Sequence, residues 1–214
     1  MDGEREPESM HDYRIETWAE PTHVEKFAAK YGCADPGDTV TFAAWLASPL
    51  PKSQALRRLA ALYLMELRGV TCELCGLDID PALEREPRHP GRVQLDHIIP
   101  SSGSGSDTWG NVRPTHATCN TERRDERVPS EAGWLRDLLS AERDAYEGRR
   151  TRASVAIMRA DHYAARLAEV TVALNRERAA ERPDEDRLNS LLRLPFEYRN
   201  LEHEWRLRAR RAEA

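Results

Sequence analysis

Cysteine, long apolar runs and, in the middle of the chain, lysine are all scarce in this sequence. Only four of the 214 residues are cysteine, too few for a small secreted fold held together by disulfides. No apolar run approaches the ~20 residues of a membrane-spanning helix, so we expect no membrane segment. Residues 1–10 are acidic and lack an apolar stretch, so we expect no secretory signal and a cytoplasmic location.

The charge balance argues against strong, unaided binding to nucleic acid. The chain has 37 acidic and 32 basic residues, which gives a formal net charge of −5 and a pI near 5.9. Residues 70–128 contain no lysine, and their acidic residues outnumber their arginines. Because phosphate binding normally depends on Lys and Arg, we expect weak intrinsic affinity for DNA unless a partner or a second subunit supplies positive surface.

Composition and periodicity divide the chain into three predicted segments. Residues 1–69 combine a polar tail with helical periodicity, residues 70–128 hold Gly, Pro, Cys and short apolar stretches, and residues 129–214 are again helical. Hydrophobic residues make up 40% of the chain and charged residues 32%. These proportions are typical of a helix-rich globular protein. The expected fold class is α+β and mainly helical, with a small core between N- and C-terminal helical extensions.

Capping residues predict two helices before the core. Asp38 is suited to cap a short helix that runs through Ala47. Ser53 is suited to cap the next helix, and Gly69 to end it. Its apolar residues recur at helical spacing. They are Leu56, Leu59, Ala60, Tyr63, Leu64 and Leu67. We therefore expect this helix to pack one face against the core.

The C-terminal segment carries an apolar seam that steps by four and three residues. Its members are Ala156, Ala160, Tyr163, Leu167, Val170 and Leu174. Leu188, Leu191 and Leu192 could pack on this seam as a helical hairpin, and we expect Pro183 and Pro195 to interrupt the helices there. The same seam could instead form a homodimer, and its length does not decide between the two.

Three of the four cysteines and one histidine have the spacing of a structural zinc site. Cys72 and Cys75 are separated by two residues and followed by Gly76, which favours a tight turn that presents two thiolates. His116 and Cys119 are three residues apart, so they share one face of a helix. The four side chains predict a closed, tetrahedral Cys₃His site for Zn²⁺. A catalytic role for His116 is the alternative.

A second group of polar residues is interleaved with these ligands. Asp96 and His97 lie in a short β-prone run, Asn111 follows a Ser/Gly-rich loop, and Asn120 comes directly after Cys119. The predicted order is strand, loop, strand, helix. Neighbouring residues of a regular strand face opposite sides, so Asp96 and His97 can serve one site only if the strand twists or ends there.

The local expectations around this group are specific. Residues 112–114 are expected to form the return strand. A helix should run from His116 to about Arg127, with Thr115 as its N-cap. Trp109 is expected to pack at the base of the loop, with stacking on DNA as the alternative.

Together these pieces resemble the HNH (His-Me finger, ββα-metal) endonuclease family, in the variant that ends in Asn. The pieces are Cys72-Glu73-Leu74-Cys75-Gly76, Leu95-Asp96-His97-Ile98-Ile99-Pro100, Asn111 and His116-Ala117-Thr118-Cys119-Asn120. The resemblance covers about residues 70–127 and none of the flanking helices. It implies a zinc-stapled ββα-metal core, treble-clef-like at its zinc knuckle, and metal-dependent hydrolysis of phosphodiester bonds in DNA.

The resemblance also implies a role for the residues of the catalytic group. His97 would be the general base that takes a proton from the attacking water. Asp96 and Asn120 would hold one catalytic divalent ion, and their oxygen ligands suit Mg²⁺ or Mn²⁺ better than Zn²⁺. Asn111 would bond the loop and orient the His97 ring.

Two further features follow from the same resemblance. Arg123 or Arg124, one turn after Asn120, would contact a phosphate of the substrate. Asn120 stands where the family name has its final His. An amide is a weaker ligand than imidazole for transition metals but is acceptable for a hard ion.

Two alternatives stay open. One is a non-catalytic zinc module that binds nucleic acid or a protein partner, which would not need Asp96, His97, Asn111 and Asn120 together. The other concerns the biological setting. The acidic charge and the helical flanks suit a nuclease subunit that works with a partner such as an ATPase, in an antiviral defence complex or a mobile element. Phage DNA packaging and restriction of modified DNA would also fit.

Overall fold

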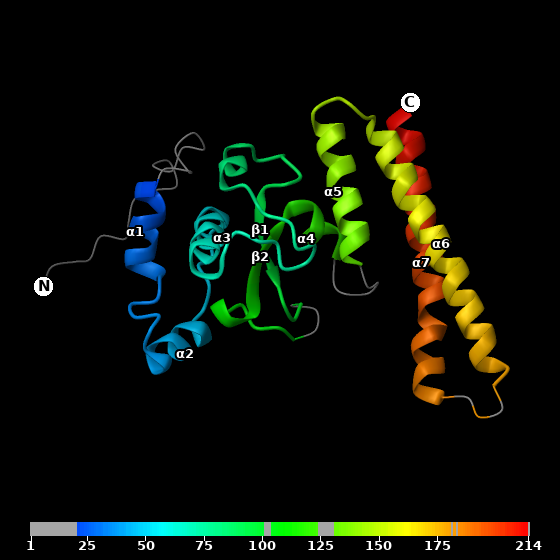
Figure 1. Ribbon diagram of the computed structural model, residues 1–214, viewed down its shortest axis with the longest axis horizontal. Helices are drawn as coiled ribbons and strands as arrows, with labels where there is room; N and C mark the ends of the chain where they lie inside the picture. Colours follow the sequence, from blue (N-terminus) through cyan, green and yellow to red (C-terminus); the bar gives the residue numbers. More distant parts are fainter. Residues whose placement is uncertain (1–20, 101–103, 124–130, 181, 183, 214) are drawn as a thin grey trace, which may run out of the picture. The chain divides into compact units, whose positions relative to one another are not determined.

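The computed structural model describes residues 21–100, 104–123, 131–180, 182 and 184–213. The chain divides into two compact units, residues 1–120 and 121–214, whose elements are labelled in Figure 1. The described residues are mainly helical and contain one two-stranded sheet, which confirms the α+β class. None of the described helices is both long enough and apolar enough to cross a membrane.

Three α-helices precede the sheet in the described part of the first unit. They are α1 (Pro21–Tyr31), α2 (Thr39–Ala47) and α3 (Gln54–Arg68). The Asp38 side chain accepts a hydrogen bond from the backbone N of Thr41, and that of Ser53 accepts one from Leu56, so both predicted N-caps are confirmed. Gly69 ends α3 with a φ of 95°, a conformation that glycine adopts without strain.

The buried face of α3 lies at the centre of the first unit. It packs against α1 and against both strands of the sheet. Four aromatic rings gather beside it, from Phe27, Trp45, Tyr63 and Trp109. The rings of Trp45 and Trp109 are stacked with centroids 4.8 Å apart, and Trp109 is 2% exposed. The prediction that Trp109 packs at the base of the loop is therefore confirmed.

The sheet and the next helix have the predicted strand, loop, strand, helix order. Strand β1 (Val93–His97) pairs antiparallel with β2 (Val112–His116), in a register that sets Val93 opposite His116 and His97 opposite Val112. Two 3₁₀ turns flank the ladder, η3 (Pro81–Arg85) before β1 and η5 (Trp109–Asn111) before β2. Helix α4 (Ala117–Arg123) follows β2 directly.

One expectation about α4 is wrong. Thr115 is not an N-cap, because the ladder extends through Thr115 and His116 and the helix begins at Ala117. The Thr115 hydroxyl donates to the Gln94 carbonyl across the ladder, at 3.4 Å. Thr115 and His116, which local sequence predicts at the start of a helix, therefore pair with β1 as part of the strand. The predicted end near Arg127 lies outside the described residues.

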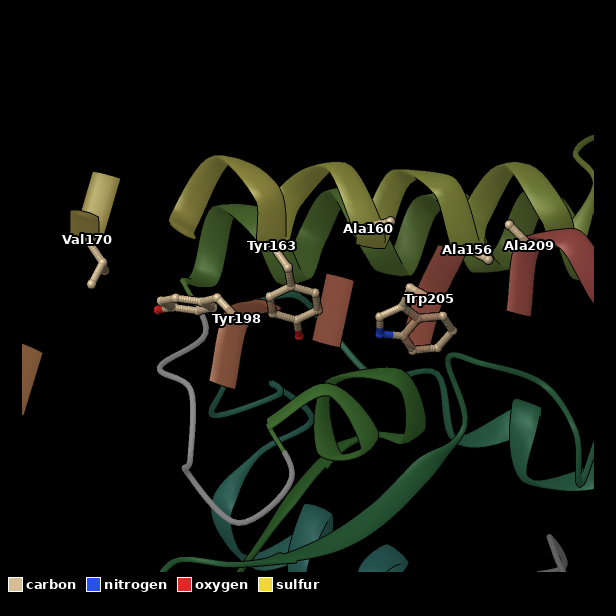
Figure 2. Packing of buried hydrophobic residues seen from close by; sticks show 7 residues of the cluster. All are labelled: Ala156, Ala160, Tyr163, Val170, Tyr198, Trp205 and Ala209. Carbon is tan, nitrogen blue, oxygen red and sulfur yellow. The ribbon is translucent and has the colours of Figure 1, made fainter. Parts of the chain in front are cut away.

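The described residues of the second unit form three long helices. They are α5 (Ala132–Tyr146), α6 (Arg152–Arg178) and α7 (Glu185–Glu213). Helices α6 and α7 form the predicted helical hairpin, and Figure 2 shows the residues that they bury between them. They are Ala156, Ala160, Tyr163 and Val170 of α6 and Tyr198, Trp205 and Ala209 of α7.

Pro195 lies inside α7 and does not interrupt it, contrary to the expectation from sequence. A proline removes one backbone donor and crowds the preceding turn. Burial on both sides of Pro195 holds the helix continuous here. The α7 residues that pack on α6 around it are Leu191, Leu194, Tyr198 and Leu201. Leu192 is 44% exposed and lies off this face. Pro183 lies outside the described residues.

A buried cation completes the core of the second unit. Arg159 is 4% exposed, and its guanidinium lies 4.1 Å from the centroid of the Trp205 ring. It pairs with Glu122 at 3.3 Å and with Glu142 at 3.0 Å. The Tyr163 hydroxyl also donates to Glu122. The buried charges of Arg159 and Glu122 are therefore paired with each other within this unit, although the Arg159 Nε has no hydrogen-bond partner among the described residues.

Candidate functional site

Four metal-ligating side chains come together from the knuckle (the turn that carries Cys72 and Cys75), the end of β2 and the start of α4. The ligand atoms of Cys72, Cys75, His116 and Cys119 all lie within 4.8 Å of one another, and all four residues are fully buried. Tetrahedral zinc bonds of about 2.0–2.3 Å separate ligand atoms by roughly 3.5–3.8 Å. The His116 Nδ1 lies 3.4 Å from Cys75 Sγ and 3.8 Å from Cys119 Sγ. The cluster therefore fits a closed structural zinc site.

Hydrogen bonds around the cluster select the ligand atom of His116. Its Nε2 lies 3.1 Å from the Asp78 carbonyl oxygen, so Nε2–H donates there and Nδ1 presents a lone pair to the cysteines. The turn that aligns Cys72 and Cys75 is closed by Gly76, whose φ is 73° and whose N–H donates to the Cys72 carbonyl. A fully buried His116 held in this way fits zinc binding and not a catalytic role.

The electrostatics of the cluster match a cation site. Hydrogen bonds from Cys119 and Cys75 lower the pKa of Cys72 far below its ordinary value, while interactions with Cys72 and Cys75 raise the pKa of Cys119. Burial by itself lowers the pKa of His116, but hydrogen bonds and negative charge from Cys72 and Cys75 raise it to about 9. The protonation of these buried groups is thus coupled, and thiolate and imidazole are the ligand types that suit Zn²⁺, whose binding displaces their protons.

His97 is the last residue of β1, so the strand ends where the sequence argument required it to end or twist. The side chain of His97 is 25% exposed, whereas Asp96 is 4% exposed. The His97 Nε2 lies 3.1 Å from Oδ1 of Asp107, a residue on the far side of the loop. Asp107 in turn pairs with Arg57 of α3. Sequence reasoning missed Asp107 as a partner of His97.

Asp96 and Asn120 are held against the ladder by polar contacts. The Asp96 carboxylate accepts a hydrogen bond of 2.9 Å from Nε of Arg113, the residue directly opposite it on β2. The Asn120 amide donates to Gln94 Oε1 at 3.0 Å and to the Leu95 carbonyl at 3.3 Å. Asn120 therefore lies against β1 beside the position of Asp96. Carboxylate and amide oxygens are ligands that a hard divalent ion accepts, and a shared ion at Asp96 and Asn120 stays a prediction.

Asn111 closes the base of the loop between the strands. It is 7% exposed. Its side chain accepts from the Ile99 N–H at 2.9 Å and donates to the carbonyls of Ile99 and Ser106 at 2.9 and 2.8 Å. A side chain at Gly105 would overlap the Ile99 carbonyl, so the closure also needs glycine there. Because Asp107 follows Ser106, Asn111 helps to fix the residue that contacts the His97 ring.

Of the two arginines predicted to bind phosphate, the structure describes one. Arg123 is the last residue of α4 and is 6% exposed. Arg124 lies outside the described residues. A phosphate contact at either residue therefore stays a prediction.

Comparison with known families agrees with this geometry. Residues 72–126 match the family described as HNH endonuclease, over a segment that contains the knuckle, both strands and α4. The resemblance seen in the sequence is therefore confirmed for this segment, and the match supports a nuclease of the HNH family. A search of the curated proteins and a search of the solved structures each found no match.

Proposed function

We propose that this protein is a metal-dependent HNH endonuclease that hydrolyses phosphodiester bonds in DNA. The observation that carries the proposal is the partly exposed imidazole of His97 at the end of β1, held by the Asp107 carboxylate, on the strand that carries Asp96 and whose Leu95 carbonyl accepts from Asn120. A purely structural zinc module needs the cysteine cluster but has no use for this second arrangement. The match of residues 72–126 to the HNH endonuclease family supports the same reading.

His97 acts as the general base in this mechanism. With Nε2–H donating to Asp107, the lone pair of the imidazole is on Nδ1, which takes a proton from the attacking water. The water oxygen then forms the new bond to phosphorus as the bond to the 3′ oxygen breaks, and the leaving oxygen takes a proton from solvent, which gives a 5′-phosphate and a 3′-hydroxyl. Asp107 is a positioning residue, because it fixes the ring and its tautomer without contacting the substrate.

Asp96 and Asn120 would hold the catalytic divalent ion, Mg²⁺ or Mn²⁺, through their side-chain oxygens. Once bound, such an ion supplies positive charge to the scissile phosphate and to the leaving oxygen. Arg113 orients the Asp96 carboxylate from the facing strand. Cys72, Cys75, His116 and Cys119 would hold a structural Zn²⁺ that joins the knuckle to α4.

The setting of the enzyme is also a proposal. A net charge of −5 suits a cytoplasmic subunit that relies on a partner for positive surface. An ATPase subunit of an antiviral defence or mobile-element complex would be such a partner. A homodimer through the C-terminal helices would double whatever basic surface the chain has. Co-purification and light scattering at several concentrations separate the two, and a monomer fully active alone would remove both.

Cleavage by a matched pair of variants tests the nuclease proposal. Supercoiled, linear and single-stranded DNA and RNA are incubated with added Mg²⁺ or Mn²⁺, with and without EDTA. The change His97→Ala should slow cleavage by about 10²–10⁴-fold, because it removes the general base. Zinc content and the thermal midpoint should stay at parental values. The matched control is His203→Ala, an exposed histidine of α7, which should cleave at the parental rate.

Two results would contradict the proposal. Cleavage by His97→Ala at the parental rate would remove the general base. A zinc-loaded parental protein that binds nucleic acid but cleaves none of the substrates under any of the metal conditions would favour the non-catalytic zinc module.

A further inference from the structure

A small polar pocket lies between α3 and the start of β1, within the first unit. Its volume is ≈160 Å³. That is room for about five waters and well below the ~300–1,000 Å³ of sites for drug-sized ligands, so the pocket suits one compact polar group. The polar residues that line it include Arg57, Arg58, Arg92, Gln94 and Asn120.

Positive charge exceeds negative charge around this pocket. Arg57 pairs with Asp107. Arg58 pairs with the fully buried Glu84, whose negative charge also acts on Arg92. Three arginines therefore line the pocket, while the carboxylates of Asp107 and Glu84 lie outside its lining. The lining itself is positively charged and suits an anion.

The state of Arg92 supports an anion there. Burial lowers the pKa of Arg92, and the like charge of Arg58 lowers it further, while Glu84 opposes both. An anion between the two arginines would offset their repulsion. The amide of Gln94 uses its oxygen to accept from Asn120, which leaves its NH₂ group as a further donor beside the guanidinium groups. The pocket thus offers donors where an anion would carry oxygen atoms.

We propose that this pocket binds a phosphate group of the nucleic-acid backbone, next to the phosphate that is cut. The proposal rests on the proposed nuclease function, because Asn120 borders the pocket and is also the proposed ligand of the catalytic ion. Guanidinium forks match phosphate oxygens in geometry as well as charge. Helix α3 and its Arg57 and Arg58 lie outside the segment that matches the HNH family, so the pocket gives a flanking helix a part in substrate binding.

Arg92→Gln is the variant that tests the pocket with least damage to the fold. Changing Arg58 would leave the buried carboxylate of Glu84 without its direct partner, which is destabilising by itself. The matched control is Arg88→Gln, which removes the same charge from an exposed residue four positions earlier. Binding is measured in the His97→Ala background without added Mg²⁺ or Mn²⁺. Fluorescence anisotropy with a short fluorescein-labelled DNA duplex reports affinity over a range of salt concentrations.

Arg92→Gln should weaken binding about tenfold, the scale of one charge-assisted contact. It should also reduce the slope of log affinity against log salt by about one. Arg88→Gln should change affinity less than about twofold. Equal affinities of the two variants would overturn the proposal. Should Arg92→Gln fail to fold, Arg92→Lys takes its place. That variant keeps the charge without the planar fork, so weaker binding with the parental salt slope is expected, and parental affinity would overturn the proposal.

The proposed phosphate pocket and the proposed nuclease activity can be refuted separately. A parental protein that cleaves DNA, with Arg92→Gln binding as Arg88→Gln does, would refute the pocket and keep the nuclease. A parental protein that cleaves nothing, yet binds DNA more weakly after Arg92→Gln alone, would keep the pocket and refute the nuclease.

Discussion

The two compact units achieve stability by different means. In the first, α3 packs its apolar face on two five-residue strands, and four buried ligand atoms within 4.8 Å of one another join the turn at Cys72 and Cys75 to α4. In the second, helices of 27 and 29 residues bury a continuous set of aromatic and aliphatic side chains. The comparison teaches that the candidate site residues lie where the Cys/His cluster fixes the backbone locally. In the helical unit, by contrast, the buried charge stabilises the fold.

Removing zinc should give the largest effect and should separate the two units. The change Cys119→Ser deletes one ligand, and structural zinc sites contribute apparent binding free energies of about 10–16 kcal/mol. We expect β1 and β2 to lose protection from hydrogen exchange while α6 and α7 keep theirs. The control is Cys33→Ser, which should retain one zinc ion per chain because Cys33 lies outside the cluster. Loss of protection across both units would show that the second unit depends on the first.

Removing the buried cation of Arg159 should give the next largest loss of stability, in the second unit. The change Arg159→Met keeps much of the stem but leaves Glu122 and Glu142 without their cation, which should cost about 3–5 kcal/mol of unfolding free energy. Zinc content should not change. Arg208→Met is the control, because Arg208 covers the same Trp205 ring at 4.4 Å but is half exposed, and it should cost less than about 1 kcal/mol. Equal losses in chemical denaturation would contradict the stabilising role of burial.

Asp107→Ala should alter chemistry in the first unit with little change in stability, because the Asp107 side chain is 49% exposed. We expect cleavage to slow about 10–100-fold through kcat, since the His97 ring loses the group that fixes its tautomer. Asp107→Asn keeps an acceptor for Nε2–H and should recover part of the rate. The ¹⁵N spectrum of the labelled imidazole should report Nε2–H in the parental protein and a mixture in Asp107→Ala. An unchanged tautomer would contradict the positioning role.

The smallest expected effect is a pH dependence of the second unit. His162 stacks on Trp134 with centroids 3.9 Å apart. Burial lowers the pKa of His162 from its ordinary value of 6.5, and Arg166 lowers it further. The groups that oppose this are Glu122, Glu131 and Glu169. The unfolded chain therefore binds this proton more readily. The stability from neutral His162 is present above about pH 6.5 and is lost as pH falls through the lower folded pKa.

A double comparison isolates that contribution. The unfolding free energy of the parental protein, followed through exchange of α6 amides, is compared with that of His162→Phe at about pH 7.5 and about pH 5. Phenylalanine keeps the stacked ring but does not titrate. The parental protein should lose more stability on acidification than the variant. Equal losses would assign the acid sensitivity to other groups.

Local sequence signals were sufficient for the elements that depend on near neighbours. The caps at Asp38 and Ser53 bond residues three positions on, and the pairs Cys72–Cys75 and His116–Cys119 are each three residues apart. Long-range pairing defeated the same reasoning elsewhere. Thr115 reads as a helix cap until its partner strand is known, and Pro195 reads as a break until the packing on α6 is seen.

The candidate site divides along the same line. Spacing and resemblance identify the four predicted zinc ligands. They also identify Asp96, His97, Asn111 and Asn120 as a group. Their partners do not. Arg113 faces Asp96 only because of the strand register, and Asp107 contacts His97 from ten positions later in the sequence. The arginines of α3 come near Gln94 only through tertiary packing. The candidate site residues could be predicted from sequence, whereas the groups that orient them needed the fold.

The register of β1 and β2 also fixes the distance between the Cys/His cluster and the His97 imidazole at the far end of the sheet. His116 and His97 terminate opposite ends of the same five-rung ladder, and four steps of an antiparallel strand span roughly 14 Å. A cobalt ion substituted at the thiolate site would therefore act as a paramagnetic reporter at a known separation. Pseudocontact shifts from it would track small displacements of the His97 ring when DNA is added, without any label attached to the proposed active site itself.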